Sequence, residues 1–158
     1  GSLSTLNGAY AVDGSGAMST LTEGQVYAIE KKEDALALLK ENKRKFAADN
    51  LEIVSGTAPE AMVELPAPTH AFIGGSSGNM NEIIRLLLDK NPEVRIVINC
   101  ITLETVTEAM NAIRDFSLTD VDIVQLSAAR SKSIGRYHMM MGENPIYIIS
   151  CSGRGEEI

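Results

Sequence analysis

The residues best suited to bind a ligand lie where predicted strands end. An apolar segment, Thr69–Ile73, runs into a glycine-rich turn, Gly74–Asn79, and a helix then begins near Met80. Glycines permit close approaches that a side chain would block, and the N–H groups at a helix start attract a carboxylate or phosphate. A tight strand-to-helix turn that binds nothing explains the same pattern equally well. The segment is therefore a candidate site whose chemistry this motif does not specify.

Acidic residues follow two other predicted strands. Glu30 follows Val26–Ile29, where a carboxylate can accept hydrogen bonds from both ribose hydroxyls of a nucleoside. The alternative is a capping role, because negative charge is stabilised beside a helix N-terminus. Asp13–Gly16 follows Ala9–Val12 and would bring the backbone close to the amino-acid or phosphate part of a ligand. A plain turn is the alternative there.

The elements that must position these residues alternate between strand and helix. Strands are expected at 9–12, 25–29, 51–54, 69–73, 94–100, 121–126 and 144–149, and helices at 31–48, just after Pro59, at 80–90 and at 103–116. Thr102 is expected to cap the last helix. The helix at 80–90 has a clean apolar face, formed by Met80, Ile83, Ile84, Leu87 and Leu88. In the helix at 31–48, Ala35, Leu38, Leu39 and Phe46 are expected to face inward.

This order predicts an α/β fold with a doubly wound, Rossmann-like sheet, mostly parallel with an antiparallel C-terminal strand. In such sheets ligands bind beyond the carboxyl ends of the strands. We therefore expect one edge of the sheet to carry Asp13, Glu30, Thr57, Gly74, Gly75 and Asn99.

Composition narrows the range of partners and locations. A length of 158 residues predicts one domain, residues 1–158, and the net charge of −7 argues against nucleic acid or an acidic membrane as a partner. No apolar run approaches the roughly 18 residues of a membrane span, and no signal peptide opens the sequence. Cys100 and Cys151 form no CxxC motif, so we expect free thiols and a cytoplasmic location. With two histidines and no cysteine cluster, no metal site is expected.

A basic segment stands out in this acidic chain. Residues 123–142 contain no Asp or Glu and carry Arg130, Lys132, Arg136 and His138. We expect a Ser/Gly-rich loop between strands, whose arginines would pair bidentately with the carboxylates of a ligand. A solvated basic loop and a subunit contact are the alternatives. Met139–Met141 suits a macrocycle, the core or an oligomer contact.

Several short motifs follow one another as in a known enzyme family. They are Val26–Glu30, Gly56–Ala61, Phe72–Asn79, Asn99–Thr105, Ala129–Arg130 and Asn144–Pro145. The chain resembles the decarboxylating precorrin-6Y (cobalt-precorrin) C-15 methyltransferases of cobalamin biosynthesis over about residues 24–150. The resemblance implies a class I methyltransferase that uses S-adenosylmethionine and a tetrapyrrole substrate, and decarboxylates the C-12 acetate. It also implies a homo-oligomer, often a tetramer, and a fused or separate C-5 methyltransferase partner.

The resemblance also assigns roles to residues. The donor would be bound by Asp13, Gly14, Gly16, Glu30, Thr57, Ala58, Gly74 and Gly75. Ser76, with Gly74 and Gly75, would lie where donor and tetrapyrrole meet. Our further candidates for substrate binding are Ser77, Asn99 and Thr102, and, from the basic segment rather than from the resemblance, Arg130, Lys132 and Arg136. Glu104 and His138 are the available proton carriers and our catalytic candidates, although helix capping by Glu104 and packing of His138 are alternatives. Thr57 stands where the family usually has Asp, so backbone contacts would have to hold the adenine.

The front of the chain departs from the family. Too few residues separate the first two strands for the family's full helix, which indicates either a missing front or an impaired donor site. The alternative function is therefore a degenerate methyltransferase-fold module that serves binding or assembly without catalysis.

Methyl transfer itself needs in-line alignment more than acid–base groups, and positioning supplies roughly 7–11 kcal/mol of barrier reduction. A nicotinamide-dependent oxidoreductase is disfavoured, because no GxGxxG follows the first strand.

Overall fold

A computed structural model describes residues 9–12, 24–74 and 78–154 of the chain. Its strands are β1 (Ala9–Val12), β2 (Val26–Glu30), β3 (Leu51–Ser55), β4 (His70–Ile73), β5 (Arg95–Cys100), β6 (Thr119–Leu126), β7 (Ala129–Ile134), β8 (Tyr137–Gly142) and β9 (Ile146–Ser152). Its helices are α1 (Glu33–Lys45), α2 (Met80–Lys90) and α3 (Leu103–Asp115), with a short 3-10 helix, η1, at Glu60–Met62.

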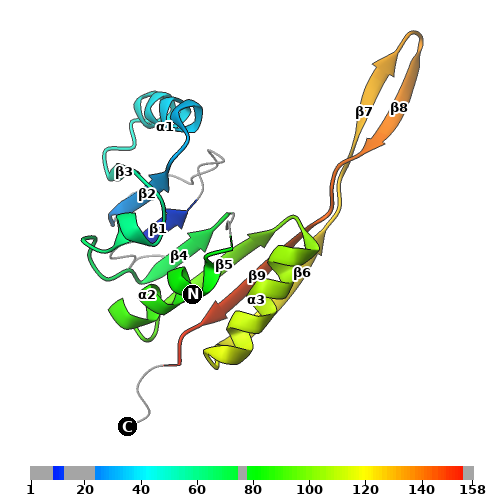
Figure 1. Cartoon of the computed structure of the whole chain (residues 1–158). Coiled ribbons are helices and arrows are strands. Elements are labelled where there is room, and N and C mark those ends of the chain that lie inside the picture. Colours follow the sequence, from blue (N-terminus) through cyan, green and yellow to red (C-terminus); the bar gives the residue numbers. More distant parts are fainter. Residues whose placement is uncertain (1–8, 13–23, 75–77, 155–158) are drawn as a thin grey trace.

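The central sheet has the strand order β3-β2-β1-β4-β5-β9-β6. Strands β1 to β5 pair in parallel, and β9 pairs antiparallel with both β5 and β6. The order reverses at β1, as it does in doubly wound sheets, and Figure 1 shows α2 and α3 lying along one face. The predicted fold class is confirmed, including the antiparallel C-terminal strand.

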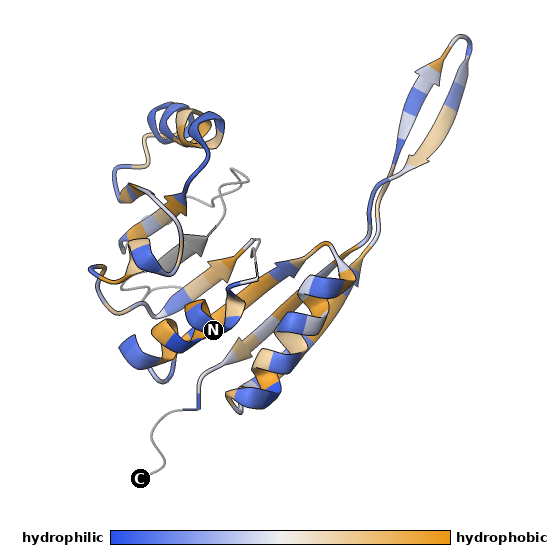
Figure 2. Cartoon of the chain, in the orientation of Figure 1, coloured by the Kyte–Doolittle hydropathy of each residue, from blue (hydrophilic) through white to orange (hydrophobic). Residues whose placement is uncertain are grey.

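Helices pack on both faces of the sheet, and the alternation of side chains decides which residues each helix covers. On one face, α2, α3 and η1 enclose the main core, in which Ile73, Ile98 and Ile149 are fully buried on adjacent strands. On the other face, Leu39 of α1 packs against Val26 and Ala28 of β2. Figure 2 shows the apolar residues gathered along β5, α2 and α3, whereas α1 is largely hydrophilic.

Two local predictions from the sequence are confirmed. The apolar face of α2 is buried, as the 3.6-residue periodicity requires: Met80, Ile83, Ile84 and Leu87 are each at most 1% exposed, and Leu88 is partly buried against the same core. The hydroxyl of Thr102 caps α3 by accepting a hydrogen bond from the backbone N–H of Thr105 at 3.2 Å.

The inner face predicted for the first helix is wrong in part. Only Leu39 is buried in α1, while Leu38 and Phe46 are 47% and 61% exposed. The helix covers β2 and β3 at one end of the sheet and therefore has little apolar surface to cover. Lys45 lies over the ring of Phe46, with its Nζ 5.7 Å from the ring centroid.

The loop predicted between the strands at 121–126 and 144–149 is also wrong, because β7 and β8 form a β-hairpin there. The two strands pair only with each other, in a separate two-stranded sheet, and a two-residue turn at Gly135 and Arg136 joins them. Gly135 has φ +60°, a conformation that glycine adopts at little cost. Figure 1 shows this hairpin projecting well beyond the body of the protein, and every residue from 129 to 142 is exposed. We call residues 129–142 the arm.

No helix in the described part of the chain has both the length and the apolar character needed to cross a membrane.

Candidate functional site

The parallel strands bring several predicted site residues to one edge of the sheet. Glu30 is the last residue of β2, Gly74 directly follows β4, and Asn99 is the penultimate residue of β5. Thr57 follows β3 by two residues. All four therefore lie at the carboxyl edge, where doubly wound sheets bind ligands. The other predicted residues of this edge, Asp13, Gly14, Gly16, Gly75, Ser76 and Ser77, lie outside the described residues.

Glu30 is held in a fixed position at this edge. It is only 5% exposed, and its Oε1 accepts hydrogen bonds from the backbone N–H groups of Lys31 and Lys32, both at 2.8 Å. Lys32 is the N-cap of α1 and provides no side-chain cap, so the Glu30 carboxylate satisfies N–H groups at this helix start. Glu30 therefore does help to cap α1, as the alternative interpretation predicted. The same two hydrogen bonds orient its carboxylate at the carboxyl edge of the sheet.

Two hydrogen bonds connect the loop at 56–58 to the elements on either side of it. The backbone N–H of Gly56 donates to the carbonyl of Glu30 at 3.0 Å. The side-chain Nδ2 of Asn79 donates to the carbonyl of Ala58, which is buried. The end of β2, the loop at 56–58 and the start of α2 are thus tied together. Space is tight here, since a Cβ on Gly56 would lie 2.9 Å from the Cβ of Ala61.

Asn99 carries a buried acceptor with no partner. Its Oδ1 has no hydrogen-bond partner within the described part of the structure, which is costly for a buried amide oxygen. A ligand that donates an N–H or O–H at the end of β5 would satisfy it. By contrast, the hydroxyl of Thr102 is already engaged, because it caps α3 and lies 2.9 Å from the hydroxyl of Thr105.

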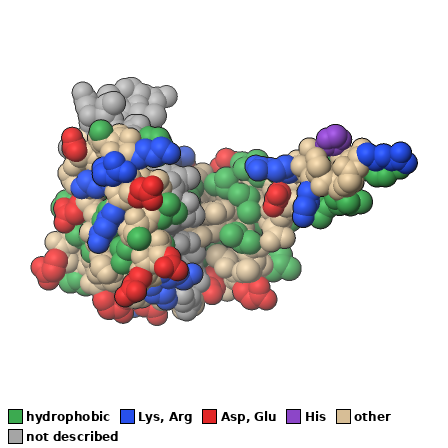
Figure 3. Space-filling view, turned by 90° about the horizontal axis from the view of Figure 1, so that it is seen from above, with side chains coloured by type: hydrophobic (Ala, Val, Ile, Leu, Met, Phe, Trp, Pro, Cys, Tyr) green, Lys and Arg blue, Asp and Glu red, His purple; other side chains and the backbone are tan. Residues whose placement is uncertain are grey.

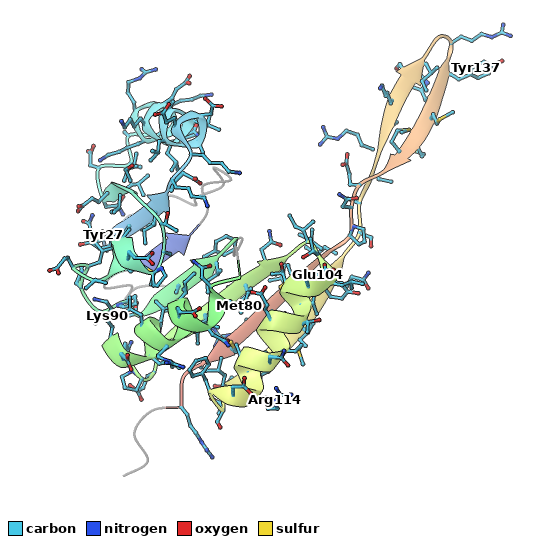
Figure 4. The ribbon with its side chains drawn as sticks, in the orientation of Figure 1. Tyr27, Met80, Lys90, Glu104, Arg114 and Tyr137 are labelled. Atoms are coloured by element: carbon cyan, nitrogen blue, oxygen red, sulfur yellow. The ribbon has the colours of Figure 1, made fainter. Side chains whose placement is uncertain are left out.

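Glu104 lies in the first turn of α3 with an exposed side chain. Figure 4 shows Glu104 near the end of β5, on the same side of the sheet as α3. The capping of this helix is done by Thr102, so an exposed carboxyl group remains beside the carboxyl edge.

The structure does not bring the basic residues of the arm to this edge. The arm leaves the sheet between β6 and β9, at the end of the sheet away from β2, and Tyr137 marks its tip. Arg130, Lys132, Arg136 and His138 are exposed, and Figure 1 shows the arm that carries them standing apart from β2 and β4 of the same chain. The guanidinium of Arg136 lies over the ring of Tyr137, 5.4 Å from its centroid. Within one chain His138 is exposed and does not pack against the sheet, and Met139–Met141 are not part of the core.

The two thiols and the other histidine supply no reactive group at the edge. Burial raises the pKa of Cys151 to about 11, and burial followed by the charge of Glu108 raises the pKa of Cys100. His70 begins β4 at the opposite edge, where burial and then Arg95 lower its pKa. Within the described ranges, no three His, Cys, Asp or Glu side chains form a possible metal site.

Comparison with known proteins assigns the chain to a family. A family model described as the precorrin methyltransferase domain matches residues 11–152. The chain belongs to the precorrin methyltransferase family. A relative from Methanothermobacter thermautotrophicus, named a probable cobalt-precorrin-6B C(15)-methyltransferase (decarboxylating), is 39% identical over 127 residues. That alignment covers 79% of this chain and 66% of the relative, so the match spans just under two thirds of the relative's length.

Solved structures of the family share the fold. The precorrin-6y C5,15-methyltransferase of Geobacter metallireducens superposes with a TM-score of 0.83 and 31% identity, covering 95% of this chain and 82% of that one. A Methanobacterium thermoautotrophicum protein described as precorrin 8W decarboxylase gives a TM-score of 0.77 and 31% identity, covering 94% and 82%.

One contributor to the site was not predicted from the sequence. Asn79 appeared only as the last residue of the glycine-rich turn, and Asn at a helix start is normally taken as a cap. Its hydrogen bond to Ala58 joins residues 21 positions apart, and the sequence around Asn79 does not indicate such a long-range contact.

Proposed function

We propose that this chain is a methyltransferase domain that uses S-adenosylmethionine to methylate a precorrin or cobalt-precorrin ring at C-15, with decarboxylation of the C-12 acetate, in cobalamin biosynthesis. The observation that carries the proposal is the linked carboxyl edge, where Glu30, the loop at 56–58 and the start of α2 are joined by hydrogen bonds in a chain of this family.

The described residues fit the donor. Glu30 presents an oriented carboxylate for the ribose hydroxyls, and the backbone around Thr57 and Ala58 borders the adenine. Gly74 is buried directly after β4, where the absence of a side chain leaves room for the reacting groups. Bound S-adenosylmethionine supplies an activated methyl group, so the contribution of the chain is alignment and exclusion of water.

Substrate contacts are proposed next to the donor. The Oδ1 of Asn99, which has no partner among the described residues, would accept a hydrogen bond from the tetrapyrrole. The exposed carboxyl group of Glu104 would carry a proton during decarboxylation. Thr102 would contribute through its backbone, because its hydroxyl caps α3.

We also propose that the chain forms a homo-oligomer through the arm, with a tetramer as the expected size. Cross-strand pairing gives the arm two different faces. One face carries the large side chains Ile134, Tyr137, Met139 and Met141 with Arg130 and Lys132, and the other is formed mainly by small or polar residues. A free hairpin of this kind is only marginally stable in water, so burial against other copies would stabilise it.

Charge supports the same arrangement. The arm is basic in a chain of net charge −7, and Figure 3 shows its cationic groups mixed with apolar ones, whereas acidic groups are spread over the body. The proposed contact of Arg130, Lys132, Arg136 and His138 with substrate carboxylates would then be made at the site of a neighbouring copy.

Both cysteines are free, which fits the reducing cytoplasm. A separate or fused C-5 methyltransferase remains a proposed partner.

The test is a reaction with labelled S-adenosylmethionine and cobalt-precorrin-6B. We expect the corrinoid product to gain one labelled methyl group and lose one carbon dioxide by mass spectrometry, and the Glu30→Ala variant to lose most of this activity. A chain that binds neither S-adenosylhomocysteine nor the corrinoid would refute the proposal.

One observation favours a second candidate, a non-catalytic module of the same fold. Residues 13–25 alone connect β1 to β2, which is close to the shortest crossover that joins parallel strands, about a dozen residues. This candidate predicts a stable oligomer without affinity for the donor, and calorimetry with S-adenosylhomocysteine distinguishes the two.

A further inference from the structure

Asn79 occupies the N-cap position of α2 without capping it. Asn is among the residues that cap helices best, yet the side chain of Asn79 makes no capping hydrogen bond. Its Nδ2 donates instead to the carbonyl of Ala58, 21 residues earlier in the chain. A carbonyl oxygen only accepts, so the amide nitrogen of Asn79 must be the group that faces Ala58.

The contrast with α3 shows that the chain uses capping elsewhere. Thr102, at the N-cap of α3, accepts a hydrogen bond from the N–H of Thr105 in the usual way. Asn79 gives up that stabilisation and holds a different segment in place.

The segment held by Asn79 borders the proposed donor site. Ala58 is 5% exposed, and the same loop is anchored at its other end by the hydrogen bond from Gly56 to the carbonyl of Glu30. Thr57, between these anchors, has an exposed side chain and sits at the carboxyl edge. The N–H of Ala61 also donates to the carbonyl of Thr57 at 2.9 Å, within the same stretch of chain. The bond from Asn79 is the one that ties this loop to α2, across 21 residues.

We infer that Asn79 is a positioning residue: it forgoes capping of α2 in order to fix the loop at 56–58 for binding the adenosyl part of the methyl donor. The inference rests on the proposed donor site, and it adds a residue that acts on the donor through Ala58 without contacting it.

The test is the Asn79→Asp variant of the chain, which keeps the size of the side chain but cannot donate to Ala58. Asp also caps helices well and places negative charge at a helix N-terminus. We expect an unchanged or raised melting temperature together with about tenfold weaker binding of S-adenosylhomocysteine in calorimetry. A merely structural hydrogen bond would lower the melting temperature and leave the affinity unchanged.

Asn91→Asp is the matched control. Asn91 follows the other end of α2, and its Nδ2 donates to the carbonyl of Pro68 at 2.8 Å, on the amino side of β4. The same substitution breaks the same kind of bond there, so we expect a lower melting temperature and unchanged affinity for S-adenosylhomocysteine.

The outcomes separate this inference from the proposed function. Equal affinity of wild type and Asn79→Asp would overturn the role of Asn79 while the donor site stands. A wild type without affinity would refute the donor site itself, and the role of Asn79 with it. If Asn79→Asp does not fold, Asn79→Ser decides the question, because serine caps helices but is too short to reach Ala58.

Discussion

Replacing Glu30 with glutamine tests both roles of this residue in one variant. Glu30 is 5% exposed, and its Oε1 accepts two backbone hydrogen bonds at 2.8 Å from Lys31 and Lys32. Glutamine has nearly the same shape and keeps one oxygen that can accept those bonds. The substitution therefore removes the charge and leaves the geometry in place.

The expected loss follows from the difference between charged and neutral hydrogen bonds. Bonds to charged groups contribute about 1.5–3 kcal/mol each and neutral ones about 0.5–1.5 kcal/mol. The two bonds to Glu30 should together lose about 2 kcal/mol of unfolding free energy. A carboxylate that also accepts from two ribose hydroxyls should lose a similar amount of binding free energy, which corresponds to roughly 30-fold weaker binding of S-adenosylhomocysteine.

Urea denaturation and calorimetry measure the two effects separately. Glu33→Gln is the matched control, since Glu33 lies in the first turn of the same helix with an exposed side chain. It should lose about 0.5 kcal/mol of stability and no affinity. If Glu30→Gln loses stability but binds S-adenosylhomocysteine as tightly as wild type, Glu30 only caps α1 and the ribose assignment is wrong. If stability is also unchanged, the reasoning about its charged hydrogen bonds fails as well.

Three further outcomes follow from the structure. Gly153→Ala should lower the unfolding free energy measured in urea by about 2 kcal/mol, because a Cβ there would lie 2.0 Å from the carbonyl oxygen of Pro92; an unchanged value would contradict this packing. Stability should fall as the pH rises from 9 to about 11, because Cys151 stays a neutral thiol in the folded state while the unfolded state ionises, and Cys151→Ala should reduce this slope in pH-dependent denaturation. Met139→Ser should lower the oligomer mass in light scattering, whereas Met140→Ser, on the other face of the arm, should not; equal effects would argue against the proposed contact face.

Regular periodicities made most of the fold predictable. The apolar face of α2 repeats every three to four residues, and such a face must be buried wherever the helix packs. The alternation of strands and helices implies a parallel sheet, and parallel strands end at a common edge. The alternation of strands and helices was therefore enough to predict that Glu30, Gly74 and Asn99 lie at the carboxyl edge.

The arm lacked such a signal. Its strands alternate between small and large residues, but the large ones include Arg130 and Lys132, so no apolar periodicity marks residues 129–142, and Ser, Gly and basic residues there are typical of loops. For Leu38 and Phe46 the sequence did carry a signal, but it predicted the wrong burial. Their spacing fits the apolar face of an amphipathic helix, whereas α1 covers the end of the sheet and leaves both side chains exposed.

Local sequence was enough to determine which segments become strands and helices and which edge of the sheet carries Glu30 and Gly74, because those properties depend on short-range periodicity and chain order. Only the tertiary structure decided that Asn79 turns away from its own helix toward Ala58, that the Glu30 carboxylate is fixed by two N–H groups, and that the basic residues of the arm stand apart from the edge. These features depend on where distant segments meet in space, and no spacing along the chain encodes that.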